Sequence, residues 1–193
     1  NYNGQPGDLT TRLIDSSYDT TPSFAASTSN PFSLNIVGRL ASPDFADLDG
    51  DGDLDIFIGN SLGDTIYFQN TGTFLTPSYN TSTSNPFNLD DSGSSASPDF
   101  ADLDADGDLD AFIGNSLGNT IYYQNTGTSL APAFATSSSN PFGLVDVGMF
   151  TSPDFTDLDS DGDLDALIGN RNGNTIYLEN TGTSTSPAFA TSS

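Results

Sequence analysis

The nine residues Asp47-Leu-Asp-Gly-Asp-Gly-Asp-Leu-Asp55 decide the fold, and closely similar stretches occur twice more in the chain. The second stretch is Asp102-Leu-Asp-Ala-Asp-Gly-Asp-Leu-Asp110, and the third is Asp157-Leu-Asp-Ser-Asp-Gly-Asp-Leu-Asp165. Each carries five aspartates at alternate positions, with a glycine at the sixth. Two unit charges about 5 Å apart in water repel by roughly 0.8 kcal/mol, so converging carboxylates need a positive partner. Oxygen ligands at alternate positions around a glycine turn suit a hard divalent cation, and calcium first.

These stretches belong to a repeat of 55 residues that runs through the chain without insertion or deletion. Landmarks of the repeat are Ser-Pro-Asp-Phe, which begins at Ser42, Ser97 and Ser152, and Asn-Pro-Phe, which begins at Asn30, Asn85 and Asn140. The repeat predicts one continuous domain made of residues 29–83, 84–138 and 139–193. Residues 1–28 are a divergent half-repeat without an aspartate loop, matched through Thr21-Pro-Ser-Phe24 to Thr76-Pro-Ser-Tyr79.

Within one period the sequence predicts only β-structure. The expected strands of the first repeat are 42–47, 54–58 and 65–69, with a fourth around 77–80, separated by turns rich in Gly and Asn. Ile56-Phe-Ile58 and Ile66-Tyr-Phe68 are apolar on both faces, so the hairpin they form needs cover on both sides. Sheets stacked face to face around an axis provide that cover.

Composition narrows the classes of function. The chain of 193 residues has 26 acidic residues against three basic ones, for a formal net charge of −23. Nucleic acids and anionic membranes are therefore disfavoured as partners, and no apolar run approaches the length of a membrane span. With no His, Cys or Lys, the chain lacks a catalytic triad, a reactive thiolate and a Schiff-base lysine. Paired carboxylates for glycoside hydrolysis remain formally possible, but we predict no enzyme and no catalytic residue.

The block from Asp44 to Asn60, followed by Ile66-Tyr-Phe-Gln-Asn-Thr-Gly72, resembles the FG-GAP/VCBS-type repeat of integrin alpha-subunit propellers and of many bacterial surface proteins. The resemblance covers all three full repeats. It implies four-stranded β-propeller blades, each with Ca²⁺ in a loop between two strands. Each repeat would use four aspartate side chains and one backbone carbonyl as ligands. The implied ligands are Asp47, Asp49, Asp51, Asp55 and the carbonyl of Asp53; Asp102, Asp104, Asp106, Asp110 and the carbonyl of Asp108; and Asp157, Asp159, Asp161, Asp165 and the carbonyl of Asp163.

The chain departs from this family in its number of blades. Propellers close with four to eight blades, and three and a half cannot close a ring. Either the chain is part of a longer array, or it completes its sheets with another copy. Two copies would give a closed ring of seven blades, whereas a head-to-tail contact that does not close would give a fibre. The sequence does not choose between them.

We therefore predict a calcium-binding, structural or adhesive protein outside the cell or on its surface, where millimolar calcium keeps weak sites filled. It is expected to associate with copies of itself. A carbohydrate-binding propeller module and a propeller fragment of a larger secreted protein are the alternatives. The tyrosines that could line a sugar-binding surface are Tyr67, Tyr122, Tyr123 and Tyr177, although packing between blades is the better reading of them. Asn80-Thr-Ser82 is a possible N-glycosylation site.

Overall fold

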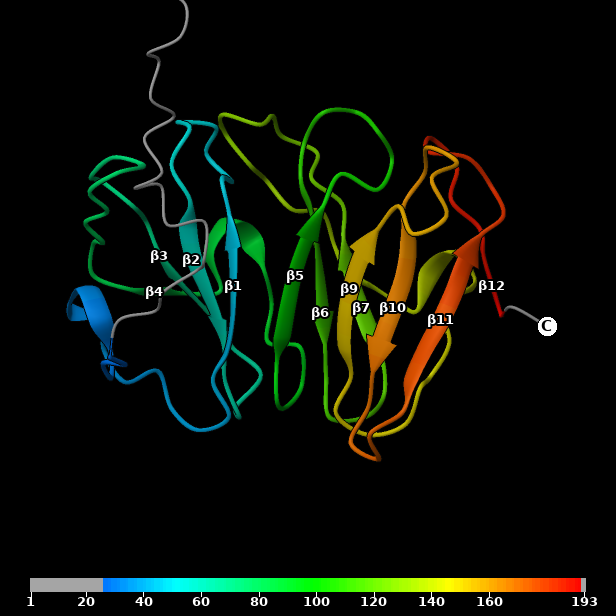
Figure 1. The fold of residues 1–193 in the computed structure, drawn as a ribbon, viewed down its shortest axis with the longest axis horizontal. Helices are drawn as coiled ribbons and strands as arrows, with labels where there is room; N and C mark the ends of the chain where they lie inside the picture. Colours follow the sequence, from blue (N-terminus) through cyan, green and yellow to red (C-terminus); the bar gives the residue numbers. More distant parts are fainter. Residues whose placement is uncertain (1–25, 192–193) are drawn as a thin grey trace, which may run out of the picture.

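The computed structural model describes residues 26–191, which form three four-stranded antiparallel sheets standing side by side (Figure 1). We call them blades 1, 2 and 3 in chain order. Blade 1 has β1 (Ser42–Ala46), β2 (Asp55–Gly59), β3 (Thr65–Phe68) and β4 (Thr83–Ser84). Blade 2 has β5 (Ser97–Ala101), β6 (Asp110–Gly114), β7 (Thr120–Tyr123) and β8 (Ser138–Ser139). Blade 3 has β9 (Ser152–Thr156), β10 (Asp165–Gly169), β11 (Thr175–Asn180) and β12 (Phe189–Thr191). The predicted fold class, all-β with four-stranded blades, is confirmed.

The blades follow one another in a row that does not close into a ring within residues 26–191. β1 lies next to β5, and β5 lies next to β9. The hydroxyl oxygens of Ser42 and Ser97 are 3.0 Å apart, and the Ser97 O–H group donates a hydrogen bond to the hydroxyl oxygen of Ser152 at 3.2 Å. Almost all of the expected half-repeat, residues 1–28, lies outside the described residues. No helix in the described part of the chain is long and apolar enough to cross a membrane.

Each blade is built on the hairpin that the sequence predicts. In blade 1, β2 pairs antiparallel with β3, and Asn60 closes the turn between them. The Asn60 side-chain oxygen accepts hydrogen bonds from the backbone N–H groups of Leu62 at 2.8 Å and Asp64 at 3.2 Å. Asn115 and Asn170 make the same bonds in blades 2 and 3. An asparagine that satisfies two backbone donors of its own turn explains why Ile-Gly-Asn ends the strand in every repeat.

The fourth strand lies further along the chain than the sequence predicts. In blade 1 it is β4, whereas Tyr79 forms only an isolated bridge with Asn70. The Asn70 side-chain oxygen accepts hydrogen bonds from the backbone N–H groups of Gly72 and Ser78, both at 3.0 Å. The segment between Asn70 and Tyr79 is therefore closed on itself. In blade 3 the outer strand β12 does start at the position equivalent to Tyr79.

Each Asn-Pro-Phe sequence opens a short 3-10 turn, as expected of a turn signal. The turns are η1 (Pro31–Ser33), η2 (Pro86–Asn88) and η3 (Pro141–Gly143). Asn85, just before η2, adopts a left-handed conformation with φ +48°, and its side-chain oxygen accepts a hydrogen bond from the N–H of Thr65 at 2.8 Å. This bond ties the connection between two blades to β3.

The apolar core lies between the blades. We call the side of a blade that packs on the following blade its forward face, and the opposite side its back face. Phe57 on the forward face of blade 1 packs against Phe100 of blade 2, with ring centroids 4.3 Å apart. Phe112 of blade 2 packs in the same way against Phe155 of blade 3, at 4.1 Å. All residues of β2 and β6 are buried, which confirms that the hairpins of blades 1 and 2 are covered on both sides.

Candidate metal centres

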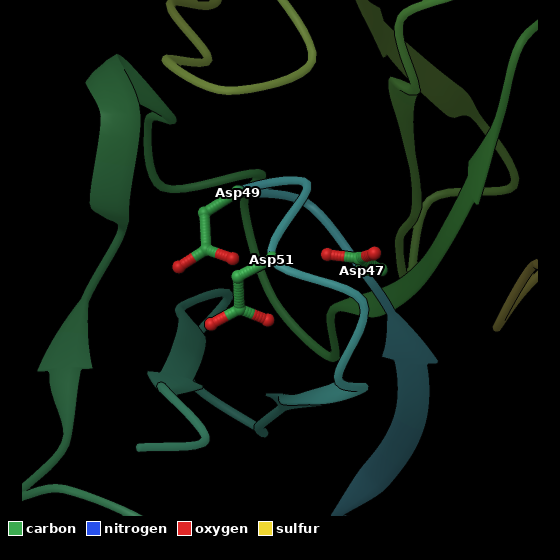
Figure 2. Close-up of side chains that lie close together, drawn as sticks. All are labelled: Asp47, Asp49 and Asp51. Carbon is green, nitrogen blue, oxygen red and sulfur yellow. The ribbon is translucent and has the colours of Figure 1, made fainter. Parts of the chain in front are cut away.

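The loop between β1 and β2 brings three aspartate side chains together. Carboxylate oxygens of Asp47, Asp49 and Asp51 lie within 4.8 Å of one another (Figure 2). Asp47 follows directly after β1, and Asp49 and Asp51 project from the loop that continues from it. The equivalent loops of blades 2 and 3 form the same clusters from Asp102, Asp104 and Asp106, and from Asp157, Asp159 and Asp161. Nine of the predicted side-chain ligands thus gather in three groups, one per blade.

Backbone hydrogen bonds shape the loop around these carboxylates. In blade 1, Asp47 Oδ2 accepts from the N–H of Gly52, and Asp51 Oδ1 accepts from that of Asp53, both at 3.0 Å. Gly52 has φ +91°, a conformation that residues with a Cβ resist, which accounts for the glycine at this position. The backbone carbonyl of Asp53, like those of Asp108 and Asp163, remains a predicted ligand that no contact in the structure tests.

Each of the three loops has at least one carboxylate oxygen that is buried without a hydrogen-bond partner. They are Asp47 Oδ1, Asp49 Oδ1, Asp104 Oδ1 and Asp163 Oδ1. A buried, unpaired carboxylate oxygen is costly, because water that solvated it has been removed and nothing replaces it. A hard cation among these oxygens would supply the missing partner, and an all-oxygen donor set is the chemistry that calcium prefers. The donor set of each loop therefore fits a metal ion.

The fourth predicted side-chain ligand occupies a different environment. Asp55 is fully buried at the start of β2; its Oδ1 accepts from the N–H of Asn70 at 2.7 Å and its Oδ2 from the hydroxyl of Tyr67 at 2.8 Å. Burial raises the pKa of Asp55 to about 6, while these two hydrogen bonds act in the opposite direction. Asp110 and Asp165 have the same pair of partners in their blades. These three aspartates lie outside the three-carboxylate clusters, and their role as ligands stays a prediction.

Sequence reasoning missed two residues that support the loop. Besides the tyrosine hydroxyl, Gln69 Nε2 donates to Asp49 Oδ2 at 2.7 Å, and Gln124 Nε2 donates to Asp104 Oδ2 at 2.9 Å. Both glutamines lie 20 residues after the aspartate they contact. The sequence shows that each glutamine follows its aspartate at the same spacing in both repeats. Only the register of the hairpin shows that the two side chains are in contact.

Comparison with known families agrees with this architecture. The FG-GAP-like repeat matches residues 47–113 and again residues 102–168, which together make up more than half of the chain. The chain belongs to the FG-GAP-like repeat family. No curated protein matches it.

The third FG-GAP-like repeat differs from the other two at its aspartate loop. Asp47, Asp49, Asp102 and Asp104 are half-buried, whereas Asp157, Asp159 and Asp161 are all exposed. Where the first two repeats have Gln69 and Gln124, the third has Glu179, which carries no N–H to donate and adds a negative charge. The third loop is thus the most open of the three and has the most acidic surroundings.

Three further aspartates lie on the first strands of the three FG-GAP-like repeats. They are Asp44 on β1, Asp99 on β5 and Asp154 on β9. Asp99 Oδ2 accepts a hydrogen bond from the backbone N–H of Phe155 in the next blade, at 3.1 Å. Burial, and then the neighbouring carboxylates of Asp44 and Asp154, raise the pKa of Asp99 to about 7.

The other residues singled out in the sequence also have a place. Tyr67, Tyr122 and Tyr123 are buried between blades, which confirms the packing interpretation for them; Tyr177, in blade 3, is half-buried. Asn80 is exposed in the loop before β4, so its side chain is accessible for glycosylation, which stays a prediction.

Proposed function

We propose that this FG-GAP-like repeat protein is a non-enzymatic calcium-binding module with a structural or adhesive role outside the cell, and that it associates with copies of itself. The observation that carries the calcium proposal is the set of buried, unpaired carboxylate oxygens in the three loops. Calcium bound there would supply positive charge. Asp47, Asp49 and Asp51, and their equivalents in blades 2 and 3, would hold it.

The position of the loop explains why calcium would stabilise a blade. The loop joins the end of β1 to the start of β2, which are paired strands of one sheet. Without a cation, its carboxylates repel one another and favour an open loop. With a cation, the same carboxylates tie the two strands together, so the free energy of binding adds to the free energy of folding.

The non-enzymatic and extracellular parts of the proposal rest on composition and chemistry. The chain has no His, Cys or Lys for nucleophilic or Schiff-base catalysis. Extracellular calcium is concentrated enough to fill even weak carboxylate sites. The carbohydrate-binding alternative gains no support, because three of its four tyrosines are buried between blades.

Calcium titration by calorimetry, with thermal unfolding in EDTA and in millimolar calcium, tests the proposal. We expect three binding events and a higher melting temperature in calcium, since a site occupied at a hundred times its Kd adds about 2.7 kcal/mol to the unfolding free energy. Both effects should fade as the pH falls, because protons compete for the carboxylates. Asp49→Asn should weaken one binding event, whereas Asp90→Asn, an exposed aspartate outside the loops, should not. A melting temperature unchanged by EDTA would refute calcium as a structural ion.

A further inference from the structure

Each aspartate loop in the interior of the row is covered by a segment of the next blade. Over blade 1, the covering segment is the turn at Thr128–Ala131 of blade 2, which is held by a bridge between its two ends. A Cβ placed on Gly50, within the aspartate loop, would lie only 2.7 Å from Leu130 Cδ2 and from the carbonyl oxygen of Ser129. We call this turn, and its equivalents in the other blades, the cover turn.

The same arrangement recurs between blades 2 and 3. Asp104 and its hydrogen-bond partner Gln124 line a hollow together with Thr185 and Ser186, which belong to the cover turn of blade 3. The first two aspartates of each covered loop are half-buried, whereas their equivalents in blade 3, Asp157 and Asp159, are exposed. Burial of this part of an aspartate loop therefore depends on the blade that follows it.

Blade 1 carries a cover turn that has no preceding aspartate loop to cover within residues 26–191. Its ends, Thr73 and Thr76, form the same bridge as in blade 2. Between them, Phe74 is 72% exposed and Leu75 is 84% exposed. Leu75 holds the position of Leu130, which contacts Gly50 in the interior of the row while 70% of its own surface stays exposed. The leucine at this position therefore touches the loop with one edge only, and the ends of the row are marked by Phe45 and Gly169 more than by the exposure of Leu75.

The two end faces of the row are the back face of blade 1 and the forward face of blade 3. Within the row, a forward face and a back face pack together at each interface between blades. The back face of blade 1 has an apolar hollow lined by Leu34, Val37, Phe45, Ile56 and Ile58, with Phe45 55% exposed. In blades 2 and 3 the residues equivalent to Phe45 pack on the preceding blade, Phe100 on Phe57 and Phe155 on Phe112. The forward face of blade 3 offers Leu167 and Tyr177, half-buried, at the positions that receive these rings, together with the exposed Leu158.

The backbone of blade 3 also leaves room for a following blade. A Cβ on Gly59 would lie 2.1 Å from the carbonyl oxygen of Ala96, and one on Gly114 would lie 2.2 Å from that of Thr151, both in the next blade. The equivalent Gly169 has no contact of this kind; its nearest neighbours belong to Ser152 of its own blade, at 3.8 Å. The carbonyl of Ala41 from a second copy is the group that the repeat would place there.

We propose that the aspartate loop of blade 3 is completed by blade 1 of a second copy, whose cover turn at Thr73–Thr76 lies on it, so that calcium binding at the third loop and head-to-tail association are coupled. This rests on the proposed calcium binding. Two chains with a formal charge of −23 each repel one another, and the third loop concentrates that charge at the contact. Calcium in this loop lowers the repulsion, and burial by the second copy strengthens the attraction between ion and carboxylates.

Coupling of this kind is reciprocal, which gives the test two independent readouts. For the full chain, we expect sedimentation velocity to show association in calcium and monomers in EDTA. Calcium titration should resolve two equivalents whose affinity is independent of protein concentration and a third whose affinity rises with it, by about tenfold between monomer and assembly. The contact is heterologous, so the assemblies should grow in length without a fixed size.

Leu75→Asp tests the cover turn directly. Leu75 is 84% exposed, so the substitution should leave the monomer folded, but it should weaken association about tenfold and return the third calcium affinity to its monomer value. The matched control is Leu117→Asp, an exposed leucine in the hairpin turn of blade 2, which should associate as the native chain does. Asp159→Asn, in the third loop, should also weaken association.

Other outcomes overturn the proposal. If the third calcium affinity is independent of protein concentration, or if Leu75→Asp assembles like the native chain, blade 1 of a second copy does not complete the loop. If removal of residues 1–25 abolishes association while Leu75→Asp does not, the occupant of the end face is that segment. If no calcium binds at any loop, the calcium function itself fails, and this result is distinct from the others.

Discussion

Asp55, Asp110 and Asp165 are carboxylates with at most 1% of their surface exposed, in a protein that already carries a large excess of negative charge. Burial of an ionised carboxylate is costly unless hydrogen bonds or a cation compensate it. A tyrosine hydroxyl and a backbone N–H provide two hydrogen bonds to each of them. These residues thus link the aspartate loop to the hairpin of the same blade. A change in the charge of the loop therefore changes the electrostatic environment of these buried carboxylates.

Asp99 offers a test of buried charge that does not involve the loops. Its pKa is raised to about 7 from an ordinary value of 3.8, so the folded state binds more protons than the unfolded state between about pH 4 and pH 7. The contribution of Asp99 to the unfolding free energy is therefore greatest below pH 4 and is lost as the pH rises to 7. Asp99→Asn should stabilise the protein at pH 8 by on the order of 1–3 kcal/mol, with little change near pH 4. Urea unfolding in EDTA at both pH values measures this.

The amide oxygen of the Asp99→Asn variant can still accept the hydrogen bond from the N–H of Phe155, so the contact between blades is retained. Asp90→Asn, at an exposed aspartate, is the control and should give no comparable stabilisation at pH 8. An Asp99→Asn variant that is less stable than the native chain at pH 8 would show that the negative charge of Asp99 is compensated in the fold.

At the residue scale, the sequence predicted the groups that a cation would contact but not the groups that hold them. The alternating aspartates predicted the clusters because the spacing is local and chemically specific. The contacts of Gln69 with Asp49 and of Tyr67 with Asp55 depend on the register of β3 against β2, which no single residue reveals. The hydrogen bond from the Phe155 N–H to Asp99 joins two blades, so the pattern within one repeat could not predict it.

At the scale of the element, the aspartate loop contains a strained position that differs between repeats. Gly50, Ala105 and Ser160 occupy equivalent places, and all adopt a left-handed conformation, with φ of +67°, +56° and +66°. Residues with a Cβ pay roughly 1–2 kcal/mol for this conformation, and glycine does not. The loops of blades 2 and 3 therefore carry strain that the loop of blade 1 lacks.

Exchanging residues at these turns tests that strain. Ala105→Gly should raise the unfolding free energy by about 0.5–1 kcal/mol, because the strain is relieved while the unfolded chain gains some freedom. Gly107→Ala should lower it by about 1–2 kcal/mol, since Gly107 has φ +94° and no atom within 4 Å that an added methyl group could contact. Urea unfolding of both variants in calcium measures the pair. Destabilisation by Ala105→Gly would argue that the left-handed conformation at this position carries no strain.

The elements themselves could be predicted where sequence and local hydrogen bonding agree. The hairpins of residues 54–69 and their equivalents follow from two-sided apolar strands around an asparagine turn, and the structure contains them. The fourth strand was misplaced because Thr, Ser and Asn are compatible with both strand and loop. The Asn70 side chain favours a loop over residues 70–79, because it accepts hydrogen bonds from the N–H groups of Gly72 and Ser78.

At the scale of the whole molecule, the blades behave as a one-dimensional stack in which each contacts only its neighbours. The 55-residue period predicted this organisation, because equal spacing places equivalent strands and turns at equivalent positions in each blade. It could not predict how the end faces are covered, because a repeat pattern describes only the contacts between neighbouring repeats. The exposed Phe45 at one end and the open third loop at the other are visible only in the structure.

Substitution of equivalent phenylalanines separates an interior interface from an end face. Phe155 is 8% exposed and packs 4.1 Å from Phe112, whereas Phe45, at the same position of blade 1, is 55% exposed. Phe155→Ala should lower the unfolding free energy by about 3 kcal/mol, the usual loss for a buried phenylalanine. Phe45→Ala should lower it by less than about 1 kcal/mol in dilute monomer, because little buried contact is removed.

Phe45→Ala, which changes monomer stability little, should have a clear effect when association is measured. In sedimentation experiments in calcium, Phe45→Ala should weaken assembly, because in a head-to-tail contact Phe45 meets Leu167 of the next copy as Phe155 meets Phe112 within the chain. Equal losses of monomer stability for Phe45→Ala and Phe155→Ala would instead show that Phe45, too, is buried within the chain. In that case residues 1–25 would be the segment to delete next, because their repeat phase places them before blade 1.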